Sequence, residues 1–165
     1  MDDLKRQKVF DRLDAYGIRY THYEHPEVRT VEAASRYKRD DGSTACKNLL
    51  LRNRRGDRYY LVCLDAARRL DLHALAEALQ QGRLSFASER ELDERLGVAP
   101  GAVSPFGLLN DPTQQVRLLL DEHLSQVDAY SFHPNDSRST VVIARTEFLR
   151  YLARTKQPYE FIRLC

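Results

Sequence analysis

The sequence lacks a long apolar run. None of its hydrophobic stretches approaches the roughly 20 residues that a membrane helix needs, and Met1-Asp2-Asp3-Leu4-Lys5 lacks the basic start and apolar middle of a signal peptide. We therefore expect a protein of the cytoplasm with no membrane partner. Hydrophobic residues make up 42% of the 165 residues and charged residues 30%, which is ordinary for a folded protein, so disorder is not expected.

The sequence is also poor in residues that build covalent or metal-bound frameworks. Its three cysteines, Cys46, Cys63 and Cys165, form no C-x-x-C pair and no cysteine-histidine spacing typical of zinc sites. We expect free thiols, with no disulfide framework, no metal site and no cofactor. The net charge of +2 excludes a strongly basic nucleic-acid coat, so any contact with RNA must be local.

Familiar catalytic motifs are missing as well. No G-x-S-x-G turn is present, and the segment 97–101 matches neither Walker A nor G-x-G-x-x-G. His25 and His133 each precede a proline in an expected turn, a position that is typical of surface histidines. Residue types alone therefore do not identify a catalytic centre.

Short helical and strand-like segments alternate along the chain. Apolar spacing and capping residues predict helices at about 3–16, 30–37, 72–79, 89–96 and 146–152, with Thr30, Asp71, Ser88 and Thr146 as N-caps. Residues that favour β structure predict strands at about 18–23, 44–52, 59–64, 83–86, 116–120, 127–132, 139–144 and 159–162. Short turns are too frequent for a doubly wound parallel sheet. We expect a mixed α/β fold: one domain over 1–165, with a mostly antiparallel, barrel-like sheet surrounded by helices.

One lysine stands in an otherwise apolar strand. Because side chains alternate between the faces of a strand, Lys47 shares one side with Leu49 and Leu51, while Cys46 and Asn48 lie on the other. A half-buried ammonium costs free energy unless an anionic or hydrogen-bonding group meets it, so Lys47 marks either a site or a side chain that snorkels to water. Cys46, on the opposite side, is interpreted as a packing residue rather than a nucleophile.

Two other segments each allow two interpretations. Residues 99–107 contain two prolines and two glycines, which suit either a rigid pocket wall with fixed backbone N–H groups or a tight connector. Arg52, Arg54, Arg55 and Arg58 gather around the turn of the expected hairpin, as either a solvated turn or a footprint for an RNA backbone.

Four segments, taken in order, resemble one family. They are Tyr23-Glu24-His25-Pro26-Glu27-Val28-Arg29-Thr30-Val31-Glu32-Ala33-Ala34, Cys46-Lys47-Asn48-Leu49-Leu50-Leu51, Gly101-Ala102-Val103-Ser104-Pro105-Phe106-Gly107-Leu108 and Phe132-His133-Pro134-Asn135. Together they resemble the YbaK / prolyl-tRNA synthetase-associated editing domains. The likeness is strongest to the free-standing branch called ProXp-ala or PrdX, which hydrolyses alanine from mischarged tRNA for proline. The resemblance covers essentially the whole chain and implies a barrel-like mixed sheet with surrounding helices.

The resemblance also implies roles for individual residues. Lys47 matches the essential lysine of the family, and is expected to be catalytic. The residues implied to bind substrate are Thr30, Asn48, Gly101, Ser104, Pro105 and His133. The hairpin arginines are candidates for tRNA contact, and no metal is required.

Hydrolysis of an aminoacyl ester needs a water, a way to activate it and donors aimed at the developing oxyanion. The resemblance implies that Lys47 orients the ester or the terminal ribose and phosphate, and that the vicinal ribose hydroxyl of tRNA helps to activate the water. A small rigid pocket would admit alanine and exclude proline by size. Seryl-, threonyl- and cysteinyl-tRNA are alternative substrates, and a non-catalytic module that binds tRNA or a synthetase is the alternative function. Prolyl-tRNA synthetase and an elongation factor are candidate partners.

Overall fold

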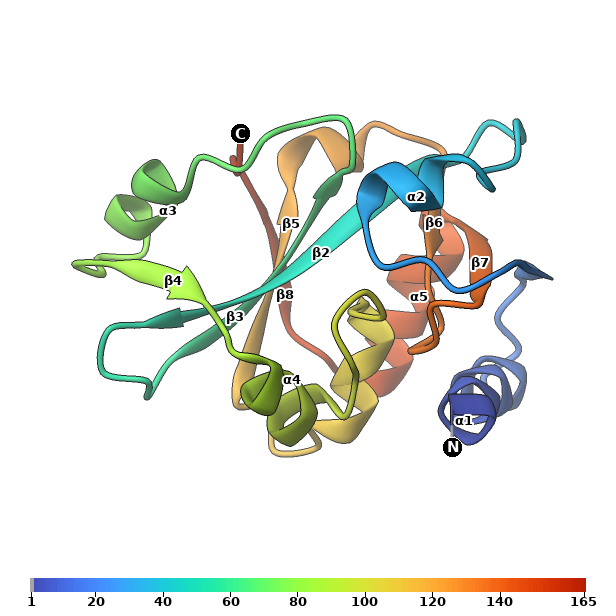
Figure 1. The fold of residues 1–165 in the computed structure, drawn as a ribbon, viewed down its shortest axis with the longest axis horizontal. Coiled ribbons are helices and arrows are strands. Elements are labelled where there is room, and N and C mark those ends of the chain that lie inside the picture. Colours follow the sequence, from blue (N-terminus) through green and yellow to red (C-terminus); the bar gives the residue numbers. More distant parts are fainter. Residues whose placement is uncertain (1) are drawn as a thin grey trace.

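One mixed sheet runs through residues 2–165, the part of the chain that the computed structural model describes (Figure 1). The strands are β1 (Thr21–Glu24), β2 (Thr44–Asn53), β3 (Tyr59–Asp65), β4 (Leu84–Phe86), β5 (Val116–Asp121), β6 (Ala129–Phe132), β7 (Ser139–Ala144) and β8 (Tyr159–Ile162). Their order is β1-β7-β6-β2-β3-β5-β8, with β4 paired to β2. Four pairings are antiparallel and three are parallel, which confirms a mixed, mostly antiparallel sheet. The order of the described strands is open, with β1 and β8 at its ends, so the sheet does not close into a barrel.

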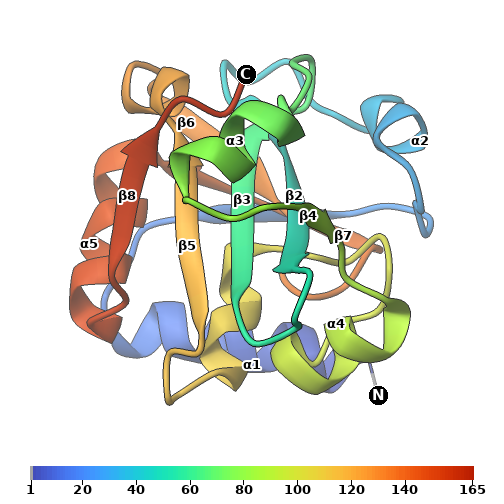
Figure 2. The ribbon, with the colours of Figure 1, turned by 90° about the vertical axis from the view of Figure 1, so that its left-hand side faces the viewer.

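Helices cover both faces of this sheet. They are α1 (Asp2–Ala15), α2 (Val31–Ser35), α3 (Leu72–Ala78), α4 (Glu89–Leu96) and α5 (Arg145–Thr155), with the 3-10 helices η1 (Pro105–Asn110) and η2 (Glu122–Ser125). Figure 2 shows α3 in front of the sheet, with β3, β5 and β8 side by side behind it. None of the helices within residues 2–165 combines the length and the apolar character needed to cross a bilayer.

The central strand β3 separates two apolar cores. Tyr60, Val62 and Leu64 pack with side chains of α3, whereas Leu61 and Cys63 belong to the larger core that includes side chains of α5. All five are at most 4% exposed, because each face of β3 is covered. Strands that are buried on both faces usually have continuous apolar sequences, and the sequence of β3 is of this kind.

Local capping signals placed the starts of α2, α3 and α4 as predicted. The Ser88 hydroxyl accepts from Glu91 N at 3.1 Å, and the Glu91 carboxylate accepts in return from Ser88 N at 3.0 Å. Thr30 caps α2 by accepting from Ala33 N, and Asp71 caps α3 by accepting from Ala74 N, each at 3.0 Å. The prediction that Thr146 caps the last helix was wrong. The chain passes from β7 directly into α5, so α5 begins at Arg145 with Ala144 as its N-cap and no side-chain cap.

Candidate active site

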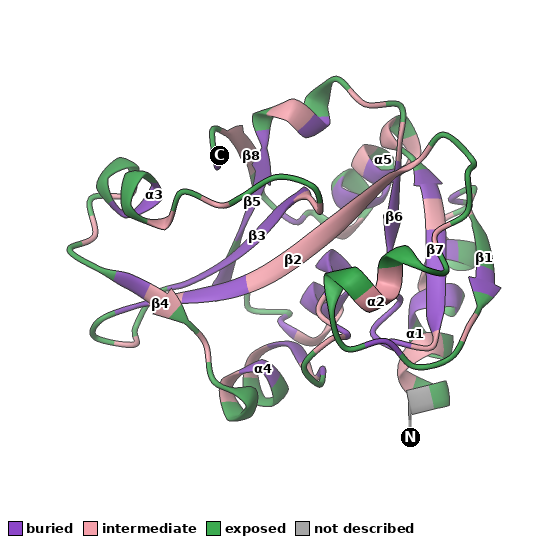
Figure 3. Cartoon of the chain, turned by 45° about the horizontal axis from the view of Figure 1, so that its top comes forward, coloured by how far each residue is buried: buried purple, intermediate pink, exposed green. Residues whose placement is uncertain are grey.

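The candidate site lies at a gap in the sheet, along one edge of β2. On this edge β2 pairs with β6 only through residues 44–45, and with β4 only through residues 51–53. Backbone groups of a strand point alternately to its two edges. The carbonyl of Leu50 accepts from Ala87 N at 2.8 Å on the β4 side, so the backbone N–H and C=O of Asn48 face the gap. Figure 3 shows this part of β2 as half-buried, next to helix α2, which is partly exposed and partly half-buried.

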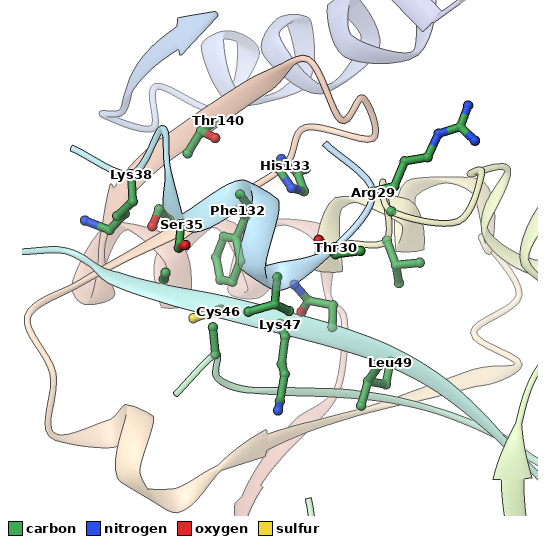
Figure 4. A pocket seen from close by; sticks show the side chains of 18 of the residues that line it. Arg29, Thr30, Ser35, Lys38, Cys46, Lys47, Leu49, Phe132, His133 and Thr140 are labelled. Atoms are coloured by element: carbon green, nitrogen blue, oxygen red, sulfur yellow. The ribbon is translucent and has the colours of Figure 1, made fainter. Parts of the chain in front are cut away.

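A cavity of about 350 Å³ occupies this gap, bordered by β2, β6 and α2 (Figure 4). Its size is that of a small-molecule site. Five of the predicted site residues line it, namely Thr30, Lys47, Asn48, Gly101 and His133. Arg29, Lys38 and Lys47 contribute positive charge, and no aspartate or glutamate within residues 2–165 lines the cavity. The cavity is therefore suited to anionic or ester groups.

Lys47 has no partner in the part of the chain that the structure describes. No hydrogen bond or ion pair joins its ammonium to any residue of 2–165, and the side chain is half-buried. In Figure 4 its Nζ lies on the opposite side of β2 from Thr30 and His133. It lies on the side of Leu49, as strand alternation predicted. Lys47 is thus not held by a carboxylate of the described residues, and its ammonium points away from the part of the cavity that Thr30 and His133 line.

Cys46 and Asn48 line the cavity as well, which corrects the expectation that alternation would turn them away from it. The cavity wraps around the unpaired edge of β2, so side chains from both faces of the strand reach it. Burial, together with the nearby Cys63 thiol, raises the pKa of the Cys46 thiol well above its usual value. A thiol that stays protonated is a poor nucleophile, which supports packing as the role of Cys46.

His133 presents a neutral ring to the cavity. Its Nδ1 lies 2.9 Å from the carbonyl oxygen of Ser139. A carbonyl can only accept, so we assign the proton to Nδ1 and an unprotonated lone pair to Nε2. Burial lowers the pKa of His133, which favours this neutral form. The sequence had suggested that His133 and His25 lie at the surface, but both are half-buried. His25 Nε2 lies 2.8 Å from the Thr140 hydroxyl.

Acidification should destabilise the protein through His133. Because burial lowers the pKa of the folded form, the unfolded chain takes up the proton first as the pH falls below about 6.5, and the free energy of unfolding decreases. We expect the melting temperature to fall between about pH 7 and pH 5, and to fall less in His133→Gln. The exposed His73→Gln is the control; a fall in His133→Gln equal to that of the wild type would contradict the prediction.

Ser104 and Pro105 were predicted to bind substrate, but the structure does not bring them to the cavity. Ser104 is fully buried; its hydroxyl donates to Asn135 Oδ1 at 3.1 Å and accepts from Phe106 N at 3.1 Å. Pro105 begins η1. These contacts tie the loop before η1 to the turn after β6, and so hold Gly101 at the cavity wall.

The hairpin arginines lie far from the cavity. Arg52 forms an ion pair with Glu91 at 3.1 Å, and Arg54, Arg55 and Arg58 are exposed at or beside the turn. Arg54 follows Lys47 by seven steps along the chain, which is roughly 23 Å at about 3.3 Å per residue. Arg54, Arg55 and Arg58 are too distant to touch the group that fills the cavity, and Arg52 is held by Glu91. Contact of these arginines with tRNA stays a prediction.

Sequence reasoning missed Ser131, which lines the cavity from β6. The signal was present, since Tyr130 and Phe132 on either side of it are apolar and enter the core. Alternation would have placed Ser131 on the other face together with His133.

Comparison with known proteins identifies the family of this chain. The model of the aminoacyl-tRNA editing domain matches residues 25–151. The chain belongs to the aminoacyl-tRNA editing domain family. The resemblance of the four sequence segments is thereby confirmed. One member of the editing family, the prolyl-tRNA editing protein ProX of Acetoanaerobium sticklandii, is 35% identical over 164 residues, which are 99% of this chain and 100% of the relative.

Two further relatives extend the comparison. The prolyl-tRNA synthetase associated domain-containing protein 1 of Danio rerio is 33% identical over 153 residues, covering 92% of this chain and 83% of the relative. A crystal structure named as a proposed trans-editing enzyme for prolyl-tRNA synthetase superposes with a TM-score of 0.71 over 98% of each chain, at 21% identity. This last likeness shows that the two chains share the editing-domain fold.

Proposed function

We propose that the chain is a trans-editing deacylase that hydrolyses the ester of mischarged tRNA, with alanyl-tRNA for proline as its main substrate. Its family and the name of the Acetoanaerobium sticklandii relative support the tRNA substrate. The observation that carries the proposal is the gap beside β2, where the unpaired Lys47, Asn48 and the neutral His133 border one cavity. The proposal treats residues 1–165 as one editing domain in the cytoplasm.

Lys47 is the catalytic residue of the proposal. Because the Nζ of Lys47 lies on the side of β2 away from His133, the proposal requires this long side chain to turn into the gap, where its ammonium holds the terminal phosphate or ribose of tRNA and stabilises negative charge on the ester carbonyl. The N–H groups of Gly101 and Val103 have no hydrogen-bond partner within residues 2–165, whereas that of Ala102 donates to the carbonyl of Ala99 at 3.1 Å. The free N–H groups are candidate donors to the oxyanion.

Water activation is assigned to the substrate. No carboxylate within residues 2–165 lines the cavity, so a carboxylate base is not at hand. The vicinal ribose hydroxyl of tRNA lies next to the ester in any aminoacyl-tRNA, and we propose that it helps to activate the water. The unprotonated Nε2 of His133 can accept a hydrogen bond from the substrate.

Exclusion of proline is assigned to the size of the cavity. The cavity has to hold the terminal ribose as well as the aminoacyl group, and Val31 and Ala34 of α2 form part of its wall. We propose that the amino-acid side chain lies against these two residues, where a methyl group fits and a pyrrolidine ring would overlap the wall. Steric rejection of a larger group is effective because overlap with a rigid wall costs more free energy than the other contacts of the substrate can offset.

A panel of charged tRNAs tests the substrate. We expect alanyl-tRNA for proline to be hydrolysed faster than the seryl-, threonyl- and cysteinyl- forms. Faster hydrolysis of one of these three would replace alanine as the main substrate. Tight binding of tRNA with no turnover on any ester would instead favour a binding module, although Lys47 lacks the carboxylate partner within residues 2–165 that a structural lysine would have.

The hairpin arginines should act on the tRNA stem and not on the aminoacyl end. We expect Arg54→Glu with Arg55→Glu to raise KM for full-length alanyl-tRNA about tenfold and to weaken its dependence on salt, because phosphate contacts release counterions. Hydrolysis of alanyl-adenosine, which has no stem, should not change. Arg154→Glu, on α5, is the control; an effect of the hairpin variant no larger than the control's would remove the hairpin from the RNA footprint.

Prolyl-tRNA synthetase and an elongation factor remain proposed partners.

A further inference from the structure

Two buried polar atoms at the cavity have no hydrogen-bond partner. They are Oδ1 of Asn48 and Oγ of Ser131, and within residues 2–165 no other buried side-chain nitrogen or oxygen is left unpaired. Both residues line the same cavity. Buried polar groups are almost always paired in folded proteins, so two unpaired acceptors that share one cavity indicate a ligand that supplies the donors.

The position of Ser131 directs its hydroxyl into the gap. Ser131 is only 5% exposed and lies on β6 in register with Ala45, the last residue of β2 that pairs with β6. Tyr130 and Phe132 point into the larger core, so the side chain of Ser131 points to the other face, as does that of His133 two residues later. The strands separate beyond this pair, and the cavity opens there.

These groups match a cationic donor with several N–H bonds. Asn48 Oδ1 and Ser131 Oγ can accept, and the Nε2 of His133 is a third neutral acceptor. The α-ammonium group of an aminoacyl ester carries three N–H donors, or two in the prolyl ester. Figure 4 shows the Nζ of Lys47 on the side of β2 away from His133. The other two cations of the cavity are paired with carboxylates: the Arg29 side chain is 80% exposed and lies 3.6 Å from Glu27, and Lys38 lies 3.1 Å from Asp41.

We infer that Ser131, together with Asn48, binds the α-ammonium group of the aminoacyl ester. Ser131 is therefore a specificity-determining residue that selects amino acids over esters without an amino group. This inference rests on the proposed deacylase function. It also explains why the fold keeps an unsatisfied hydroxyl in a buried strand: the partner arrives with the substrate.

Ser131→Ala should weaken substrate binding without lowering the stability of the fold. Ser131→Ala replaces an unpaired hydroxyl by a hydrogen atom and removes no hydrogen bond of the folded protein, so the melting temperature should stay the same or rise. Affinity for the aminoacyl group should fall, because the ammonium loses one charge-assisted acceptor. A serine with a purely structural role would show the reverse.

The test uses two ligands that cannot be hydrolysed. They are adenosine analogues that carry alanine, or lactic acid, through an amide at the 3′ position; the lactyl form has a hydroxyl in place of the ammonium. Calorimetry should show that the wild type prefers the alanyl analogue and that Ser131→Ala loses about tenfold in affinity for it, with less than about threefold loss for the lactyl analogue. In hydrolysis assays, Ser131→Ala should likewise prefer alanyl-tRNA over lactyl-tRNA less strongly than the wild type does. The change should appear in KM and not in kcat.

Three outcomes would overturn the inference: unchanged affinities in Ser131→Ala, an equal loss for both analogues, or no preference of the wild type for the alanyl form. The control is Ser85→Ala on β4, a half-buried serine outside the cavity, which should change neither selectivity nor KM. If the wild type binds the alanyl analogue selectively but hydrolyses no ester, the deacylase proposal fails while the assignment of Ser131 stands.

Discussion

Lys47→Ala should lose at least about a hundredfold in kcat/KM for alanyl-tRNA and keep the melting temperature of the wild type. The loss is expected because the ammonium is the cation assigned to the charge that develops on the ester, and removal of one such group typically costs roughly a hundred- to a thousandfold in rate. Stability should not change, since the ammonium has no partner within residues 2–165. Single-turnover deacylation and thermal melts of the same preparations measure both effects.

Lys38→Ala is the matched control for this prediction. Lys38 lines the same cavity, but its ammonium is held by Asp41 at 3.1 Å and by the carbonyl of Arg39 at 2.6 Å. A lysine that is already paired contributes less to a developing charge, so we expect a much smaller loss than for Lys47→Ala. Equal rates of Lys47→Ala and the wild type would remove Lys47 from the mechanism.

Gly101→Ala should lower both stability and activity. Gly101 has φ of +85°, and a Cβ there would lie 3.1 Å from Arg29 Cα and 3.2 Å from the carbonyl oxygen of Val28. Both are backbone atoms and cannot move aside alone, so the segment that leads to Thr30 and α2 must shift. We expect a loss of about 1–3 kcal/mol in the free energy of unfolding and at least a tenfold loss of deacylation, because the cavity wall moves.

Gly42→Ala separates the two causes of that loss. Gly42 has a similar φ of +80°, but a Cβ there would meet nothing within 4 Å. It therefore shares the cost of a left-handed backbone without the contact against residues 28–29. Denaturant unfolding and deacylation of both variants give the comparison. If Gly101→Ala behaves like Gly42→Ala, Gly101 does not shape the cavity.

Local signals predicted most of the fold because the interactions behind them are local. The capping box of Ser88 and Glu91 lies within one helical turn, and the hairpin of β2 and β3 closes over a short turn. The mixed sheet also followed from the alternation of elements. Its open ends did not, since closure depends on whether β1 meets β8, strands that come from opposite ends of the chain.

The cavity could be predicted only in part. The four sequence segments named Lys47, Asn48, Gly101 and His133, and the structure brings these residues together. The gap along β2 could not be foreseen, because it depends on where β6 and β4 stop pairing with β2, which only the tertiary fold decides. Alternation held along β2, but it could not say that the face of Cys46 and Asn48 borders the cavity as well. The same rule would have found Ser131.

The central claim is that this cavity hydrolyses the ester of a mischarged tRNA. The most direct measurement is the release of amino acid from alanyl-tRNA for proline and from prolyl-tRNA for proline, each with wild-type protein and with buffer alone. The account predicts that the protein accelerates alanine release many-fold over buffer and leaves prolyl-tRNA at the buffer rate. Alanine release at the buffer rate, or equal acceleration for both tRNAs, would contradict it.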